Sequence, residues 1–203
     1  MDTADSVTVN VPGATTTVTS MPEKVKAAAA LLAQANRARS GSYAVVSWIG
    51  YRAPQFHEVG MPYVAKAGAP RLAGFLDGLH ESRSKNPAAS INVTAHSYGS
   101  TTASYALQQT KHPVDAFLSY GSMAPPTFLC TDPLRLPWVE TFASEGPGDG
   151  ATVTGHDMFH EGGGQVGYLS PGAASTQFMG GVIAERTGRN ESEQAAERGL
   201  GRC

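Results

Sequence analysis

The stretch Ile91–Ser100 reads Ile-Asn-Val-Thr-Ala-His-Ser-Tyr-Gly-Ser, and its periodicity changes halfway along. Apolar and polar residues alternate as far as Ala95, which predicts a β-strand. The chain then turns at His96-Ser97-Tyr98, and a helical pattern follows from Gly99 to about Gln109. A serine in a tight turn between a strand and a helix is the context of a nucleophile elbow, in which the turn holds the hydroxyl clear of the sheet.

Small residues flank this serine on both sides. Ala95 lies two residues before Ser97 and Gly99 two residues after it, so the strand and the helix can pass closely. Glycine is the commoner residue at the first of these positions. The alternative is an ordinary strand-to-helix turn that contains a serine and a glycine by chance. We favour the elbow because the motif and its predicted context agree.

The remaining elements alternate in type, which predicts a parallel sheet with right-handed crossovers. The elbow strand is the third of five and is expected near the centre of the sheet, where open parallel sheets place their sites. The almost continuously apolar run Tyr43–Ile49 is typical of a strand covered on both faces. The predicted strands are Ser6–Val11, Tyr43–Ile49, Ile91–Ala95, Val114–Tyr120 and Trp138–Ala143. The predicted helices cover Ser20–Arg39, Pro70–Ser84, Gly99–Gln109 and Ser175–Thr187, with Gln55–Gly68 irregular.

The predicted fold is therefore α/β, an α/β-hydrolase fold with a compact, five-stranded, mainly parallel sheet flanked by helices. The length of 203 residues fits one domain with a substantial core, which we place at residues 5–188, with a polar C-terminal tail at 189–203. A net charge of −2 predicts no nucleic-acid surface, and no apolar run is long enough for stable membrane insertion. The first residues lack a signal-peptide pattern, which predicts a cytoplasmic product.

A serine nucleophile requires a base and an orienting carboxylate, and in this fold the chain order is serine, acid, histidine. The acid should follow a later strand. Asp149, in the glycine-rich loop after Trp138–Ala143, is our first choice, and Glu145 is the second. Asp115 lies at the start of its strand and should lie at the opposite end of the sheet.

Two histidines follow the predicted acid, His156 and His160. His160 is slightly favoured because it is farther along the chain from Asp149, and a seven-residue loop from acid to base would be tight. The alternative for each is a loop residue that bonds free backbone groups. The side chain of His96 is expected to point away from Ser97 across the turn.

The oxyanion hole should combine two backbone N–H groups. One belongs to Tyr98, directly after the nucleophile. The other comes from the loop after the first strand, where Pro12 has no N–H and so Gly13 or Ala14 must donate. Tyr51 is a candidate for the substrate pocket, with packing under the segment Gln55–Gly68 as the alternative.

The spacing of four between His156 and His160 also resembles a helical two-histidine metal site. Flanking glycines disfavour a helix, and Glu161 does not lie between the histidines. Cys130 and Cys203 show no metal-ligand spacing. We therefore predict no metal and no other cofactor.

Taken together, the chain resembles a group of actinobacterial α/β-hydrolase domains of largely undefined function, and its small sheet is similar to that of cutinase-like serine esterases. The resemblance covers about residues 7–184. It rests on an ordered series of blocks: Val11-Pro12-Gly13 with Thr15–Thr17, Trp48-Ile49-Gly50-Tyr51 with Ala53-Pro54, Gly68-Ala69-Pro70-Arg71-Leu72, His96-Ser97-Tyr98-Gly99-Ser100, Gly155-His156-Asp157, and Gly167-Tyr168-Leu169 with Pro171-Gly172.

Three positions depart from the group. Arg52 stands where an acid is usual, Ala95 where glycine is usual, and Gln165 where many members have a histidine. If that histidine is the usual base, His160 or His156 must replace it, or the domain is catalytically impaired. The expected function is a serine esterase or lipase-like hydrolase acting on small-molecule or lipid esters. The alternatives are a non-catalytic binding module and an acyltransferase with the same triad.

Overall fold

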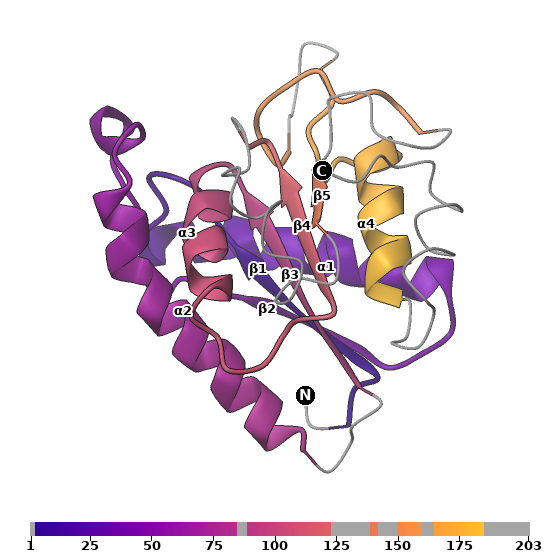
Figure 1. The fold of residues 1–203 in the computed structure, drawn as a ribbon. Helices are drawn as coiled ribbons and strands as arrows, with labels where there is room; N and C mark the ends of the chain where they lie inside the picture. The colour runs from indigo at the N-terminus through magenta and orange to yellow at the C-terminus, as the bar shows by residue number, and fades with distance from the viewer. Residues whose placement is uncertain (1–2, 85–88, 123–138, 142–149, 160–164, 185–203) are drawn as a thin grey trace.

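The computed structural model describes residues 3–84, 89–122, 139–141, 150–159 and 165–184. In these ranges five strands form one sheet with all neighbours parallel, in the order β2-β1-β3-β4-β5. The five-stranded parallel sheet is as predicted, and the elbow strand lies at its centre (Figure 1). The strands are β1 Ser6–Val11, β2 Tyr43–Ser47, β3 Ser90–His96, β4 Ala116–Tyr120 and β5 Val139–Thr141.

The strand order reverses beside β1. The chain passes from β1 to β2 on one side of it, and then returns to place β3 on the other side. At such a switch point the loops after the two neighbouring strands leave in opposite directions, which opens a crevice at their carboxyl ends. The loops that follow β1 and β3 are those that carry Gly13 and Ser97.

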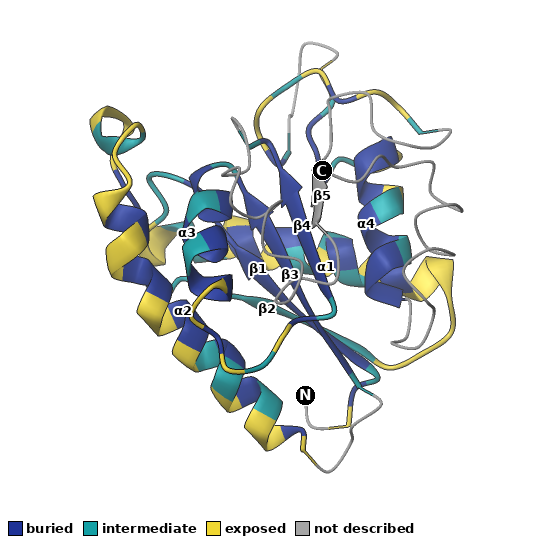
Figure 2. Ribbon diagram, viewed as in Figure 1, coloured by how far each residue is buried: buried dark blue, intermediate teal, exposed yellow. Residues whose placement is uncertain are grey.

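Helices cover both faces of the sheet (Figure 1). Helices α1 (Met21–Ala38) and α4 (Ala174–Ala184) pack together on one face, where Leu31 and Ile183 share a buried cluster with the sheet. Helices α2 (Tyr63–Ser82) and α3 (Tyr98–Leu107) pack on the other face, where Leu72 and Leu107 belong to a second cluster. The sheet is therefore the middle layer of three, and its central strands are buried (Figure 2).

Several polar side chains in the central strands pair with one another, although the buried hydroxyls of Thr8 and Ser90 have no partner in the described residues. The Thr94 hydroxyl donates to Oδ1 of Asn10 over 3.0 Å, and the Tyr120 hydroxyl donates to the same oxygen over 3.1 Å. The Asn92 amide donates to the Ser6 hydroxyl over 2.9 Å. Because a buried polar group without a partner is costly, these bonds explain how polar residues can alternate with apolar ones in fully buried strands.

The prediction that Tyr43–Ile49 is covered on both faces is confirmed in part, since Ala44 and Val46 pack against one cluster and Tyr43 and Val45 against the other. Strand β2 ends at Ser47, lies at an edge of the sheet and is half-buried along its length. An edge strand that packs on helices through both faces can be as apolar as a central one, so composition alone did not distinguish the two positions.

The prediction that Gln55–Gly68 is irregular is also wrong in part. A short 3₁₀ helix, η2, covers Phe56–Glu58, and α2 begins at Tyr63. Pro70 lies inside α2, although proline usually marks a helix start. Val64, Ala65 and Ala69 are buried against the core, and this packing offsets the loss of one backbone hydrogen bond at Pro70.

The later predictions fall partly outside the described residues. Strand β5 confirms the centre of the predicted strand Trp138–Ala143. The polar tail 189–203 and the predicted helix end at Thr187 lie outside the described ranges. Helix α4 begins at Ala174, so Ser175 lies within it, and its hydroxyl donates to the carbonyl of Tyr168. In the part of the chain that the structure describes, no helix is both long and apolar enough to span a bilayer.

Candidate active site

Ser97 occupies a strained turn at the carboxyl end of β3. Its φ is 51° and its ψ is −127°, a conformation that side chains other than glycine rarely adopt. The Ser97 N–H donates to the carbonyl of Tyr120 over 2.9 Å, and α3 begins at the next residue. The turn is thus held from the neighbouring strand β4, and the side chain of Ser97 is partly exposed beyond the sheet.

Close backbone contacts explain the small residues around the elbow. A Cβ atom on Gly99 would lie 2.5 Å from the carbonyl oxygen of Val11 and 2.6 Å from that of Pro12. A Cβ atom on Gly13 would lie 2.9 Å from Cβ of Ser97. The loop after β1 therefore passes directly against the elbow, and larger side chains at Gly13 or Gly99 would push the two apart.

His156 brings an imidazole to the serine. Its Nε2 lies 3.0 Å from Oγ of Ser97, which is within hydrogen-bond reach of a nucleophile and its base. Backbone bonds hold the His156 segment in place: Thr154 N–H donates to Val166 O over 2.9 Å, and Leu169 N–H donates to Met158 O over 2.7 Å. The ring itself is exposed, so a substrate can approach it from solvent.

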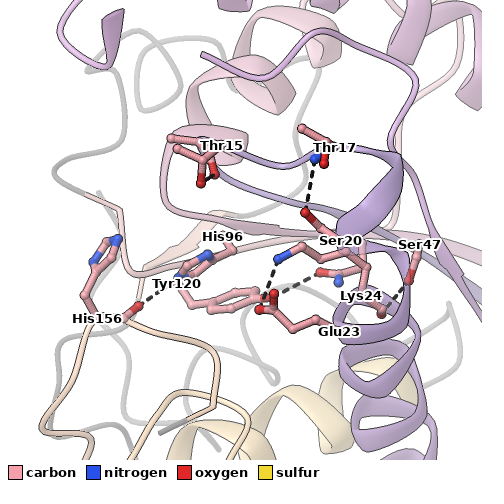
Figure 3. A network of polar contacts seen from close by, with 11 residues as sticks. Thr15, Thr17, Ser20, Glu23, Lys24, Ser47, His96, Tyr120 and His156 are labelled. Carbon is pink, nitrogen blue, oxygen red and sulfur yellow. Dashed lines mark hydrogen bonds and ion pairs between the residues drawn. The ribbon is translucent and has the colours of Figure 1, made fainter. Parts of the chain in front are cut away.

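His96 supports the same segment from beneath. Its Nε2 lies 2.9 Å from the carbonyl oxygen of His156, as Figure 3 shows. Because a carbonyl only accepts, Nε2 of His96 carries the hydrogen. Burial lowers the pKa of His96 to about 4, so the ring is neutral near pH 7. Gly121 has a φ of +61°, and a Cβ atom there would lie 3.0 Å from Nε2 of His96.

Sequence reasoning missed this role of His96. The sequence predicts only that the ring points away from Ser97, and not what it contacts. It stacks obliquely with the rings of Tyr120, His156 and Tyr168, at centroid distances of 5.1, 5.2 and 6.4 Å. The alternation of β3 indicates which face of the sheet His96 occupies, but nothing local in the sequence indicates that residue 156 would lie above it.

The backbone groups predicted to form an oxyanion hole belong to the start of α3 and to the loop after β1. Tyr98 is the first residue of α3, so its N–H has no acceptor within the helix. Gly13 and Ala14 lie in the loop that contacts the elbow, and neither N–H donates to a described backbone carbonyl. The next residue, Thr15, has a φ of 60°, and its N–H donates to the carbonyl of Pro54 over 2.8 Å. This bond fixes the loop just beyond the candidate donors.

Tyr51 lies beneath that loop. Its hydroxyl donates to the carbonyl of Pro12 over 2.9 Å, and its ring stacks on Trp48 at 5.8 Å between centroids. A Cβ atom on Gly68 of α2 would lie 2.9 Å from the Tyr51 side chain. Tyr51 is 7% exposed and borders a cavity of about 140 Å³ together with Arg52. Its contacts support the loop after β1, and its role in a substrate pocket stays a prediction.

Several predicted site residues lie outside the described ranges. They are Asp149, Glu145, His160 and Cys130. Asp115 is described, and its carboxylate accepts from Ile91 N–H at the amino end of β3, at the opposite end of the sheet from Ser97, as predicted. Gln165 is exposed. Arg52 forms a two-bond ion pair with Glu58, with N–O distances of 2.9 and 2.7 Å.

The parallel sheet, the strained serine turn and the adjacent histidine together describe a hydrolase fold. The model of an alpha/beta hydrolase family matches residues 1–155, about three quarters of the chain. The chain therefore belongs to this alpha/beta hydrolase family. The finer resemblance to cutinase-like esterases and the actinobacterial origin stay predictions.

Solved structures resemble the chain only at the level of the fold. Esterase PE8 shares 15% identity over 68% of this chain and 67% of its own, with a TM-score of 0.48. Phospholipase PlaB from Legionella pneumophila shares 12% identity over 58% of this chain, with a TM-score of 0.40. The aligned part is 25% of PlaB. No curated protein matches the chain.

Proposed function

We propose that the protein is a serine hydrolase that cleaves carboxylic esters through an acyl-enzyme intermediate. The observation that carries the proposal is the 3.0 Å separation between Ser97 Oγ and His156 Nε2. Of the two predicted bases, His156 is the one whose nitrogen lies within reach of the serine in the described residues. We therefore assign the base role to His156, in place of the slight preference for His160 from the sequence.

The proposed mechanism has two halves. Ser97 Oγ attacks the ester carbonyl while Nε2 of His156 takes the hydroxyl proton and then delivers it to the departing alcohol. A water molecule then attacks the acyl-serine, with His156 as its base, and the acid is released. Negative charge on the carbonyl oxygen would be stabilised by N–H of Tyr98 and by N–H of Gly13 or Ala14.

The third member of the triad is Asp149. A carboxylate that accepts from Nδ1 of His156 would fix the tautomer in which Nε2 is free to take the proton. Asp149 follows β5 and precedes His156, which fits the chain order of this fold. This assignment rests on the sequence alone.

We propose small-molecule or lipid esters as substrates, because the sequence of the loops near the site residues is apolar. His156 is exposed and Ser97 is partly exposed, so solvent reaches the proposed nucleophile. An alcohol is also a better leaving group than an amine, so an open site with modest substrate contacts favours esters over peptides.

Hydrolysis of p-nitrophenyl esters of different acyl length tests the proposal. We expect Ser97→Ala and His156→Gln each to reduce kcat by 10³-fold or more, on the order seen for triad residues. His160→Gln is the comparison that separates the two candidate bases, and it should retain activity. Circular dichroism should be unchanged in all three. Turnover that survives in Ser97→Ala would contradict the nucleophile assignment, and loss in His160→Gln alone would contradict the base assignment.

Two alternative functions can be distinguished from ester hydrolysis by experiment. Gln165, at a position where related domains often have a histidine, favours a non-catalytic binding module. The hydrogen-bond distance from His156 to Ser97 argues against it, because a binding module has no need of an activated serine. An acyltransferase would use the same residues, and adding an alcohol acceptor would then yield a new ester in place of the free acid.

A further inference from the structure

A second group of ionisable side chains lies at the opposite end of the sheet. His80 and Glu81 belong to the last turn of α2, and His112 lies in the loop between α3 and β4. Their ligand atoms, one from each side chain, all lie within 4.8 Å of one another. Ser90 and His96 bound β3, and a strand of that length spans about 20 Å, so this group is remote from Ser97.

The arrangement within the group is specific. The rings of His80 and His112 are stacked, with centroids 3.8 Å apart and planes 4° from parallel. Nε2 of His112 lies 3.2 Å from Oε1 of Glu81. Two imidazoles and a carboxylate therefore present nitrogen and oxygen atoms to one small volume, although the histidines are far apart in sequence.

The 3.2 Å separation of Glu81 and His112 fits an ion pair, and it also fits two ligands of one transition-metal ion. Nitrogen and oxygen ligands lie about 2.0–2.1 Å from Zn²⁺, so two neighbours in a tetrahedral site are about 3.3 Å apart. The Glu81–His112 separation of 3.2 Å already has this value. The rings of His80 and His112 are parallel, so their in-plane lone pairs do not yet converge, and His80 must rotate out of the stack to complete the set. Glu81 is exposed and both histidines are partly exposed, so this rotation is possible.

The surroundings are suited to a cation. Asp77 lies one turn before Glu81 on α2, and its carboxylate accepts from Lys111 N–H over 2.8 Å. The Asp115 carboxyl is close enough to His80 for a favourable electrostatic interaction. The carboxylates of Glu81 and Asp115 thus lie near the imidazoles, and that of Asp77 bonds the backbone of the residue before His112.

We propose that His80, Glu81 and His112 bind a divalent transition-metal ion of the zinc type, with water as the fourth ligand. Two imidazoles and one carboxylate favour Zn²⁺, Ni²⁺ or Cu²⁺ over Mg²⁺ and Ca²⁺, which prefer oxygen ligands. The ion ties the end of α2 to the loop before β4. It does not take part in ester cleavage, and the inference is independent of the proposed function.

Isothermal titration of the metal-free, 203-residue protein with ZnCl₂ tests this site. The wild type should bind one Zn²⁺ at a saturable site, and MgCl₂ should give no such binding. His80→Ala and His112→Ala should each weaken Zn²⁺ binding by at least tenfold. Ser97→Ala and His57→Ala, the latter an exposed histidine on η2, should bind as the wild type does. Co²⁺ in place of Zn²⁺ should give the visible absorption of a tetrahedral complex, and His80→Ala/His112→Ala should abolish it.

The proposal is overturned if the wild type shows no saturable Zn²⁺ binding, or if the double variant binds as tightly as the wild type. The second result would place the ion elsewhere, for example on Cys130 or Cys203. Circular dichroism of each variant without metal establishes that it folds. If a histidine variant does not fold, Glu81→Gln replaces it, since Glu81 is exposed, and the same tenfold loss is required.

Discussion

At the scale of single residues, His156 and His96 have different roles beside Ser97. His156 faces Ser97 with one ring nitrogen and is exposed, whereas His96 is buried and bonds the His156 backbone. A base must exchange protons and therefore needs access to the substrate. A supporting residue must stay in one protonation state, and burial keeps His96 neutral.

His96 therefore acts as a positioning residue whose effect should appear in kcat. His96→Ala removes the bond to the His156 carbonyl and is expected to lower kcat by up to about a hundredfold, with little change in KM, because a base displaced by about 1 Å loses that much. His96→Gln keeps an N–H donor at a similar reach and should recover most of the rate. Steady-state kinetics on a p-nitrophenyl ester measures both. Equal losses in the two variants would mean that the hydrogen bond does not matter.

The same histidine should make stability depend on pH. Its pKa is about 4 in the folded protein and about 6.5 when unfolded, so the unfolded chain binds more protons between these values. The stability that His96 contributes is complete above about pH 6.5 and is lost as the pH falls towards 4. The loss is on the order of 3 kcal/mol.

Urea unfolding at pH 7 and pH 4.5 tests this linkage. The wild type should lose more stability between the two pH values than His96→Gln, which cannot take up a proton at this position. Because all other groups are shared, they cancel in the comparison. A wild type and a variant with the same pH dependence would show that His96 titrates normally.

At the scale of elements, the elbow between β3 and α3 can form only if the loop after β1 packs closely against it. The Gly99 backbone lies so close to the carbonyls of Val11 and Pro12 that a methyl group would overlap with them. These neighbours are backbone atoms and cannot rotate away. A glycine is therefore needed at position 99 because the loop after β1 lies so close to the start of α3.

Gly99→Ala should therefore destabilise the protein by about 1–3 kcal/mol through this overlap. The matched control is Gly74→Ala, in the interior of α2, where a Cβ atom would meet nothing within 4 Å. That change should be neutral or stabilising by about 0.4–1 kcal/mol, because alanine restricts the unfolded chain. Urea unfolding of both variants gives the two values. A Gly99→Ala protein as stable as Gly74→Ala would contradict the close packing at the elbow.

At the scale of the whole molecule, the central strands connect the two helical layers. Phe117 in β4 is fully buried and packs in the cluster with α2 and α3, whereas its neighbours Ala116 and Leu118 pack in the cluster with α1 and α4. The two layers therefore share one sheet, and a defect in that sheet should weaken both.

Phe117→Ala should lower the free energy of unfolding by about 3–5 kcal/mol, the cost of a large cavity in a core. Phe56→Ala is the control, since Phe56 is 83% exposed, and it should change stability by less than about 0.5 kcal/mol. Thermal unfolding followed by circular dichroism compares them. Similar midpoints for both variants would contradict the burial of Phe117 in the core.

Much of this fold could be predicted because its signals are local. The alternation in β3 and the small residues at Ala95 and Gly99 depend on neighbours within a few residues. The edge position of β2 and the early start of α2 could not be predicted, since both depend on which distant elements cover them. The site divides in the same way. Ser97 follows from its motif, whereas the choice of His156 depends on how a glycine-rich loop folds back over the sheet.

The central claim is that His156 activates Ser97, and fluorophosphonate labelling tests it most directly. An activated serine reacts with such a probe without any knowledge of the natural substrate. The account predicts one label per wild-type molecule, found on Ser97 by peptide mapping, and labelling at least a hundredfold slower in His156→Gln. A wild type that stays unlabelled, or a His156→Gln variant labelled at the wild-type rate, would contradict it.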